Sequence, residues 1–137
     1  MKVLVTGSAG FIGSSLVIKL LDRGDTVVGI DNLNHYYDPQ IKLDRLSRFK
    51  ENKKFTNLEI DIIDREKLSN CFKDHKFDVV VNLAAQAGVR YSLENPEVYI
   101  KTNVLGFNYL LECCKDHKVK NLIYASSSSV YGGNLKI

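Results

Sequence analysis

Short runs of apolar and β-branched residues alternate along the chain with longer segments in which apolar residues recur at helical spacing. The short runs predict five strands, over Val3–Thr6, Thr26–Asp31, Phe55–Asp61, Asp78–Ala84 and Asn121–Ser126. The intervening segments predict three helices, over Ile12–Arg23, over Lys67–His75 and from Pro96 to about Lys115. Gly24 is the expected stop of the first helix, and Asp64 and Asn95 are the expected N-caps of the other two. Asn32–Lys54 fits a strand poorly, so we expect a surface excursion that contains a short helix.

Several of the predicted strands are apolar on both faces. Val27–Val28 and Val79–Val81 show no alternation with polar residues, which is typical of strands covered on both sides. Helical crossovers between such strands indicate a parallel sheet in a three-layer α/β fold. The 137 residues fit one domain, 1–137.

Composition narrows the class of protein further. With 45% hydrophobic residues and two prolines, the chain is able to bury a core and is neither disordered nor fibrous. The longest uncharged stretch, Val3–Ile18, contains three glycines and is shorter than the roughly 18 apolar residues of a membrane span. Thr6, Gly7 and Ser8 interrupt the first apolar run before it reaches the length of a signal peptide core. We therefore expect a cytoplasmic protein without a membrane partner.

Charge and cysteine content exclude two further classes. The net charge is +3, and residues 41–55 hold six bases and two acids. This basic stretch could be a nucleic-acid patch, but the chain carries no nucleic-acid-binding signature, so a solvated surface is favoured. Three cysteines without paired C-x-x-C spacing indicate neither a disulfide framework nor a zinc site. We expect reduced, packed cysteines and no metal.

Three glycines follow the first predicted strand and open the first predicted helix. Gly7, Gly10 and Gly13 provide a tight turn, a position where phosphate approaches the backbone, and close packing of helix on strand. A helix N-terminus with free N–H groups favours an anion there. A turn that serves only backbone geometry is the alternative.

An acid ends the second predicted strand. Asp31 lies 21 residues after Gly10, close to the roughly 20 expected for the residue that binds adenosine ribose hydroxyls. Its carboxylate would repel a 2′-phosphate unless a nearby base compensates it, and no base occupies positions 32–34. The sequence therefore predicts NAD rather than NADP as the cofactor.

The motifs together resemble the extended short-chain dehydrogenase/reductase family, also called the NAD-dependent epimerase/dehydratase family. The glycines are spaced G-x-x-G-x-x-G, Asp61–Ile62 resembles an adenine-contacting pair, Asn82–Gly88 resembles an N-x-A-A segment, and Tyr124–Gly132 resembles an S-S-x-x-V-Y-G segment. Gly29–Asp38 and Ala84–Ser92 are most similar to the UDP-glucuronate 4-epimerase group. The resemblance implies a Rossmann-type three-layer α/β/α fold with a parallel sheet, truncated after about five strands.

The resemblance also implies a reaction and a set of site residues. A 4-epimerase of this family moves hydride from sugar C4 onto bound NAD and returns it to the opposite face of the sugar. The hydroxyl that bonds the C4 oxygen falls on Ser127, and Ser128, Ser129 and Arg90, in a loop, are the candidate contacts to a nucleotide-sugar substrate. The candidate NAD contacts are Gly7, Gly10, Phe11, Ile12, Gly13, Asp31, Asn32, Asp61, Ile62, Leu83, Ala84, Ala85, Gln86 and Asn103. His35, Tyr36 and Tyr37 either line the adenosine side or only pack their loop.

One part of the family's machinery is not in these 137 residues. The family needs a tyrosine with a lysine four residues later, and none of the seven tyrosines has one. Tyr131 is followed at that spacing by Leu135. The hypothesis is therefore the amino-terminal cofactor portion of a nucleotide-sugar 4-epimerase. A non-catalytic NAD-binding module or half-chain that needs a partner, and a 4,6-dehydratase or reductase of the same family, are the alternatives. Assembly into a homo-oligomer is left open.

Overall fold

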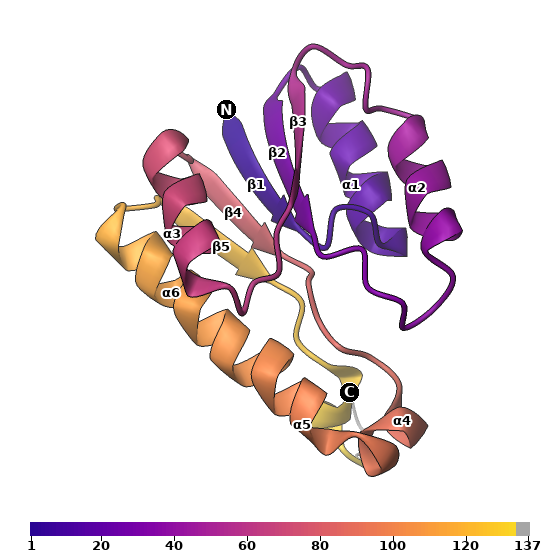
Figure 1. Ribbon diagram of the computed structural model, residues 1–137. Coiled ribbons are helices and arrows are strands. Elements are labelled where there is room, and N and C mark those ends of the chain that lie inside the picture. Colours follow the sequence, from indigo (N-terminus) through magenta and orange to yellow (C-terminus); the bar gives the residue numbers. More distant parts are fainter. Residues whose placement is uncertain (134–137) are drawn as a thin grey trace.

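The computed structural model describes residues 1–133 and shows one parallel sheet with helices on both faces (Figure 1). Its strands are β1 (Lys2–Thr6), β2 (Thr26–Asp31), β3 (Phe55–Glu59), β4 (Val79–Asn82) and β5 (Asn121–Tyr124). Its helices are α1 (Phe11–Asp22), α2 (Pro39–Ser47), α3 (Arg65–Asp74), α4 (Val89–Glu94), α5 (Pro96–Tyr99) and α6 (Phe107–Asp116). A π-helical segment, Ile100–Gly106, joins α5 to α6, and a 3₁₀ turn spans Ser128–Tyr131. The predicted three-layer α/β architecture is confirmed.

The strand order reverses at β1, in the middle of one continuous sheet. The order is β3-β2-β1-β4-β5, all parallel, and Leu4 of β1 pairs with Val28 on one side and with Val80 on the other. The chain therefore builds outward from β1 to β3 and then crosses over to β4. In open parallel sheets, ligands bind where the strand order reverses, at the carboxyl ends of the strands. That position here is the end of β1 and β4.

Alternate residues of the central strand enter two separate cores. Leu4 points toward the layer of α3 and α6, where Leu68, Phe72 and Leu110 are fully buried. Val3 and Val5 point to the opposite layer, where they pack with residues of α1 and α2. Both faces of β1 and β2 are covered, as the sequence predicts for strands that are apolar on both sides.

The last strand departs from this expectation. Ile123 and Tyr124 of β5 are each 57% exposed. The helices in the described part of the chain cover the sheet around β1 and β2 more completely than around β5 (Figure 1). β3, β4 and β5 are also shorter than predicted, because each ends two residues before the predicted end.

The helices between β4 and β5 differ from the single helix expected there. Helix α4 was not predicted, since Val89–Glu94 has four of six residues polar or charged and buries none. The expected helix from Pro96 continues to Asp116, but its middle is π-helical. Asn95 stands at the N-cap of α5 without capping it, and its side chain lies 3.3 Å from the Tyr91 hydroxyl instead. Asp64 does cap α3 and accepts from the Lys67 amide at 3.0 Å, as predicted.

The cysteines are reduced and packed, as expected. Cys71, Cys113 and Cys114 are free and buried, and burial raises the pKa of the Cys71 and Cys114 thiols to about 11. Within residues 1–133, no group of three or more potential ligands is arranged to hold a metal ion. No helix in that range combines the length and apolar character needed to cross a membrane.

Candidate functional site

The glycine turn between β1 and α1 leaves no room for side chains. Gly7 adopts a φ of +67°, and a Cβ atom there would lie 2.9 Å from the Ala84 amide nitrogen. A Cβ on Gly13 would lie 2.0 Å from the Gly7 carbonyl oxygen, so only glycine lets α1 approach the turn this closely. The turn is also tied to the neighbouring strand, because the Ser8 amide donates to the Ile30 carbonyl at 3.2 Å.

The amino-terminal end of α1 is free to receive an anion. No side chain caps the helix at Gly10, and its first turn holds no acidic residue. The first backbone N–H groups and the positive end of the helix dipole are therefore not neutralised by a side chain of the helix itself. This geometry suits a phosphate, as the glycine spacing predicts.

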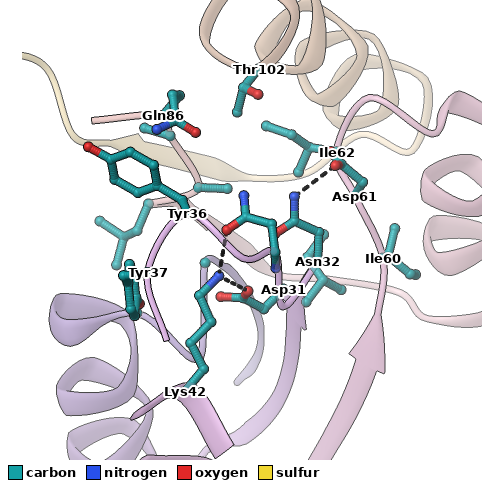
Figure 2. A pocket seen from close by; sticks show the side chains of 17 residues that line it. Asp31, Asn32, Tyr36, Tyr37, Lys42, Ile60, Asp61, Ile62, Gln86 and Thr102 are labelled. Atoms are coloured by element: carbon teal, nitrogen blue, oxygen red, sulfur yellow. Dashed lines mark hydrogen bonds and ion pairs between the residues drawn. The ribbon is translucent and has the colours of Figure 1, made fainter. Parts of the chain in front are cut away.

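Asp31 lies beside this turn at the end of β2. Its Oδ2 accepts from the Ala9 amide at 3.2 Å, and its Oδ1 accepts from the Leu33 amide at 2.9 Å. Its Oδ1 also accepts from the Lys42 ammonium at 3.0 Å, and both side chains of this ion pair are buried (Figure 2). A nearby base, which the sequence left open, is therefore present beside Asp31. This base, Lys42, belongs to α2 and lies 11 residues after Asp31 in the chain. Inspection of positions 32–34 alone could not reveal it.

The basic stretch over 41–55 is not uniformly solvated. Lys42 is buried, and Arg45, one turn later in α2, donates to the Tyr37 hydroxyl at 3.1 Å and approaches the Ala9 carbonyl at 3.4 Å. The expected solvated surface is thus wrong for Lys42 and holds for the exposed bases Arg48, Lys50, Lys53 and Lys54. Helix α2 points its two inward cations at the glycine turn and at Asp31.

A cavity of about 120 Å³, called here the turn cavity, lies between the glycine turn, the end of β2 and the end of β4. Asn32 and Asp61 face each other across it, with the amide of Asn32 donating to the carboxylate at 2.7 Å (Figure 2). The turn cavity brings together most of the expected cofactor residues, namely Gly7, Gly10, Asp31, Asn32, Asp61, Ile62, Leu83, Ala84, Ala85 and Gln86. It also contains Ile30, Asn34, Tyr36, Tyr37, Lys42, Ile60 and Thr102, of which only the two tyrosines were considered from sequence.

Four expected cofactor residues do not line this cavity, namely Phe11, Ile12, Gly13 and Asn103. Gly13 is buried against the turn, where it sets the packing of α1. Phe11 and Ile12 are 75% and 63% exposed at the start of α1. They present backbone rather than side chain to the turn, as first-turn residues of an uncapped helix do.

Thr6 and Asn82 connect the ends of β1 and β4. The Thr6 hydroxyl donates to the Asn82 side-chain oxygen at 2.6 Å and accepts from the amides of Leu83 and Ala84 at 3.1 and 3.0 Å. Both side chains are buried, and Thr6 is fully so. This network fixes where the chain leaves β4, and it places Leu83–Gln86 along the turn cavity.

A larger cavity of about 630 Å³, called here the strand-end cavity, lies beyond β4 and β5. It shares the four residues Leu83–Gln86 with the turn cavity, so one ligand can follow that segment from one cavity to the other. Phe107 and Tyr124, with ring centroids 5.2 Å apart, line part of its apolar wall. Ser127, the expected catalytic hydroxyl, also lines it.

Asn103 holds the segment between the two cavities. Its side-chain oxygen accepts from the Gln86 amide at 2.8 Å, and its side-chain nitrogen donates to the Gln86 carbonyl at 2.9 Å. Asn103 lies in the π-helical segment and lines the strand-end cavity. Both ends of its amide are therefore bonded to backbone, and the residue positions the wall of the cavity.

Tyr99 fixes the next residues of the same segment. Its hydroxyl contacts the carbonyls of Ala87, at 2.8 Å, and Gly88. Burial and the nearby Tyr36 hydroxyl raise the pKa of Tyr99 above its ordinary value of 10.0. Sequence reasoning missed this role, because the contact joins residues from two different elements.

The expected substrate contacts do not come together at one cavity in the way that most of the expected cofactor residues do. Arg90 lies in the first turn of α4 and not in a loop, its side chain is exposed, and it lines neither the turn cavity nor the strand-end cavity. Ser128 and Ser129 lie in the 3₁₀ turn after β5, and their side chains are outside what the structure describes. Leu135 lies outside the described residues.

Comparisons with known proteins, by sequence and by structure, relate this chain to the same group of proteins. The family model described as GDP-mannose 4,6 dehydratase matches residues 4–137. Protein CapI of Staphylococcus aureus is 53% identical over 98% of this chain and 40% of its own length. UDP-glucuronate 4-epimerase 4 of Arabidopsis thaliana is 48% identical over 100% of this chain and 31% of its own length.

Among solved structures, the UDP-glucuronic acid 4-epimerase of Bacillus cereus, in complex with UDP-glucuronic acid and NAD, is similar to this chain with a TM-score of 0.89. It is 39% identical over 98% of this chain and 42% of its own chain. The UDP-glucose 4-epimerase of Thermus thermophilus, in complex with NAD, has a TM-score of 0.79 at 36% identity, over 93% of this chain and 38% of its own. The chain thus spans less than half the length of the relatives it matches.

Proposed function

The chain belongs to the GDP-mannose 4,6 dehydratase family of NAD-dependent epimerases and dehydratases, and we propose that it is the amino-terminal, NAD-binding portion of a nucleotide-sugar 4-epimerase. The single observation that carries the proposal is the junction of the two cavities along Leu83–Gln86, directly beside the glycine turn. The relatives of known name support the epimerase reaction over other reactions of the family.

In this proposal NAD lies along the carboxyl ends of β2, β1 and β4. The pyrophosphate is held by the uncapped N-terminus of α1, where glycines keep the backbone open. The adenosine half occupies the turn cavity, with its ribose at Asp31 and its base near Asp61 and Ile62. The nicotinamide half follows Leu83–Gln86 into the strand-end cavity.

The bound cofactor would supply a reversible hydride acceptor, and this chain's residues would orient the reacting sugar. The Ser127 hydroxyl, at the edge of the strand-end cavity, would hydrogen-bond the oxygen on sugar C4. The cavity's apolar wall of Phe107 and Tyr124 would keep water from the hydride path. The proton-accepting tyrosine and its lysine are not among residues 1–137, so they would come from another part of the protein.

We propose a UDP-glucuronate-like substrate. The support is the identity to UDP-glucuronate 4-epimerases and the row of hydroxyls Ser127, Ser128 and Ser129, which offer donors to a sugar carboxylate. A 4,6-dehydratase of the family would need acids at the positions of Ser128 and Ser129. Arg90 is the proposed contact to a phosphate or carboxylate at the outer end of the site.

Calorimetric titration of the 137-residue chain with NAD tests the cofactor assignment, and a sugar-nucleotide assay tests the catalytic one. We expect saturable one-to-one NAD binding and no epimerisation of UDP-glucuronate by the chain alone. Absence of NAD binding would contradict the cofactor assignment. Epimerisation by the isolated chain would show that another group replaces the tyrosine and lysine.

A non-catalytic NAD-binding module is the second candidate, because no tyrosine of this chain has the required lysine. The two candidates differ once the rest of a related epimerase is supplied as a separate chain. Recovery of turnover on mixing supports the epimerase portion, and NAD binding without any recovered turnover supports the module.

A further inference from the structure

Lys42 brings a buried positive charge to the adenosine end of the proposed NAD site. The residue is 6% exposed and lines the turn cavity, and its ammonium lies 3.0 Å from the Asp31 carboxylate. Lysine is almost never buried to this degree without a partner. The carboxylate that would repel a 2′-phosphate is therefore already paired.

The ammonium has a hydrogen-bonding capacity that the protein does not exhaust. A lysine ammonium has three donors, and Asp31 and the Asn34 side-chain oxygen, at 3.0 and 3.3 Å, accept from Lys42 within residues 1–133. Figure 2 shows the Lys42 side chain with these contacts among the residues that line the cavity. One N–H is thus left for an oxygen of a ligand in the turn cavity.

Further donors surround the pair, and Asp61, the other acid among the residues lining the turn cavity, accepts from Asn32 at 2.7 Å. Both Asp31 oxygens accept backbone N–H bonds in addition to the ion pair. The guanidinium of Arg45, one turn later in α2, lies near the Ala9 carbonyl. Charge-assisted bonds of this kind are the ones that bind phosphate oxygens well.

We infer that Lys42 sets the discrimination between NAD and its 2′-phosphorylated form, NADP, in this chain. Lys42 neutralises Asp31 and offers a hydrogen-bond donor to a 2′-phosphate. The preference for NAD over NADP is therefore smaller than it would be if Asp31 were unpaired. This inference rests on the proposed NAD-binding function and concerns the ribose end of the same site.

The test is the ratio of the NADP dissociation constant to the NAD dissociation constant, measured by calorimetry for the wild-type chain and for Lys42→Met. The variant removes the charge and leaves Asp31 unpaired, so NADP binding should weaken more than NAD binding. We expect the ratio to rise roughly tenfold, since a unit charge this close to a phosphate is weakly screened in a buried site. Lys50→Met, on the exposed side of the same basic stretch, is the matched control and should leave the ratio unchanged.

Two further variants separate this role from a structural one. Lys42→Gln keeps a side-chain donor without the charge and should raise the ratio as Lys42→Met does, even if the methionine variant fails to fold. Lys42→Arg restores the charge and should return the ratio toward that of the wild type. A purely structural Lys42 would weaken both cofactors equally, and an unchanged ratio in folded Lys42→Gln would overturn the inference.

The adenosine end can be probed separately with ADP and with adenosine 2′,5′-bisphosphate, which need only the turn cavity. For Lys42→Gln we expect the same rise in the ratio of the dissociation constant of adenosine 2′,5′-bisphosphate to that of ADP. If the wild-type chain binds neither NAD nor ADP, the proposed function fails, and the inference fails with it. If NAD binds and only the ratios fail to respond, the inference alone is wrong.

Discussion

At the glycine turn, the absence of a single methyl group decides whether the site can form. Gly7 and Gly13 face each other with less space than any Cβ can occupy, and Gly7 also meets the backbone after β4. The site is therefore shaped by backbone contacts that no side chain could replace. The Thr6 hydroxyl also holds the backbone here, because its three hydrogen bonds join the end of β1 to the end of β4 and the residues after it.

Gly13→Ala should damage both folding and NAD binding. The added Cβ would lie 2.0 Å from the Gly7 carbonyl oxygen, so α1 or the turn must move. We expect a loss of about 3 kcal/mol in the free energy of unfolding and at least a roughly tenfold weaker NAD affinity. Urea denaturation and calorimetry measure the two effects.

Gly133→Ala is the matched control, because nothing lies within 4 Å of a Cβ at that position. It should change neither quantity. Wild-type behaviour of Gly13→Ala would show that α1 does not pack this closely in solution.

Among the elements, the π-helical segment between α5 and α6 has the clearest structural role. π-helical turns are rare and concentrate at functional sites. Here the segment carries Asn103 to the backbone of Gln86, where its side chain supplies both a donor and an acceptor. The segment is thus the support of the wall that joins the two cavities.

Asn103→Ala should loosen this wall. Gln86 is buried, and its amide and carbonyl would each lose a partner, so we expect a loss of about 1–3 kcal/mol in the free energy of unfolding. NAD affinity should fall as well, because the nicotinamide half is proposed to follow this segment. Hydrogen exchange at the Gln86 amide and NAD titration are the measurements.

Asn108→Ala, on an exposed position of α6, serves as the control and should stay within about 0.5 kcal/mol of the wild type. Retained protection of the Gln86 amide in Asn103→Ala would mean that another group holds the segment.

The fold was predictable from sequence to the extent that its signals are local. Hydrophobic runs such as Val27–Val28, the stop at Gly24 and the cap at Asp64 each depend on a few neighbouring residues, and all are confirmed. Helix α4 was missed because it buries no residue and shows no apolar stripe.

The candidate site was predictable where the glycine spacing and the strand ends mark it. Lys42 could not be assigned, because its side chain reaches Asp31 only after α2 folds back over the end of β2. The roles of Asn103 and Tyr99 depend on contacts across 17 and 12 residues, for which the chain carries no local signal. Ion pairs and backbone contacts of this kind belong to tertiary structure.

Across the whole molecule, the two ends of the sheet are held in different ways. The site end depends on backbone contacts and neutral hydrogen bonds, as at Thr6 and Asn103, together with the buried Lys42–Asp31 ion pair. The opposite end depends on charge, because Asp25 accepts from the N-terminal ammonium at 2.9 Å and from Arg23 at 2.6 Å. Asp78 there accepts from the Lys2 amide at 2.9 Å and from Lys120 at 3.0 Å.

The charged contacts of Asp25 and Asp78 predict that the free energy of unfolding depends on pH. The bond from the N-terminal ammonium holds the pKa of Asp25 below its ordinary value of 3.8, and the Lys2 amide, with Lys120, lowers the pKa of Asp78. A lowered pKa in the folded state stabilises the fold above the unfolded pKa, and this stability is lost as pH falls through the folded value. Urea midpoints should therefore fall as the pH drops below about 4.

Asp25→Asn should be less stable than the wild type at neutral pH, and the difference should shrink as the pH falls through the folded pKa of Asp25. Asp22→Asn, an exposed change at the end of α1, should leave the pH profile unchanged. A constant difference between wild type and Asp25→Asn at all pH values would show that Asp25 does not act through its charge.

The strand order has a consequence for how the molecule acquires its binding site. β1 and β4 meet along Val3–Thr6 and Val79–Asn82, so the pairing closes a loop of about 76 residues and comes after β2, β3 and their helices are synthesised. Contacts of such long sequence separation form late in folding, because the entropy of closing the loop must be overcome first. The segment Leu83–Gln86, which lines both cavities, comes directly after the paired residues of β4. A nascent or partly unfolded chain can thus have every helix in place and still be unable to recognise a dinucleotide, which makes ligand competence a marker of completed folding.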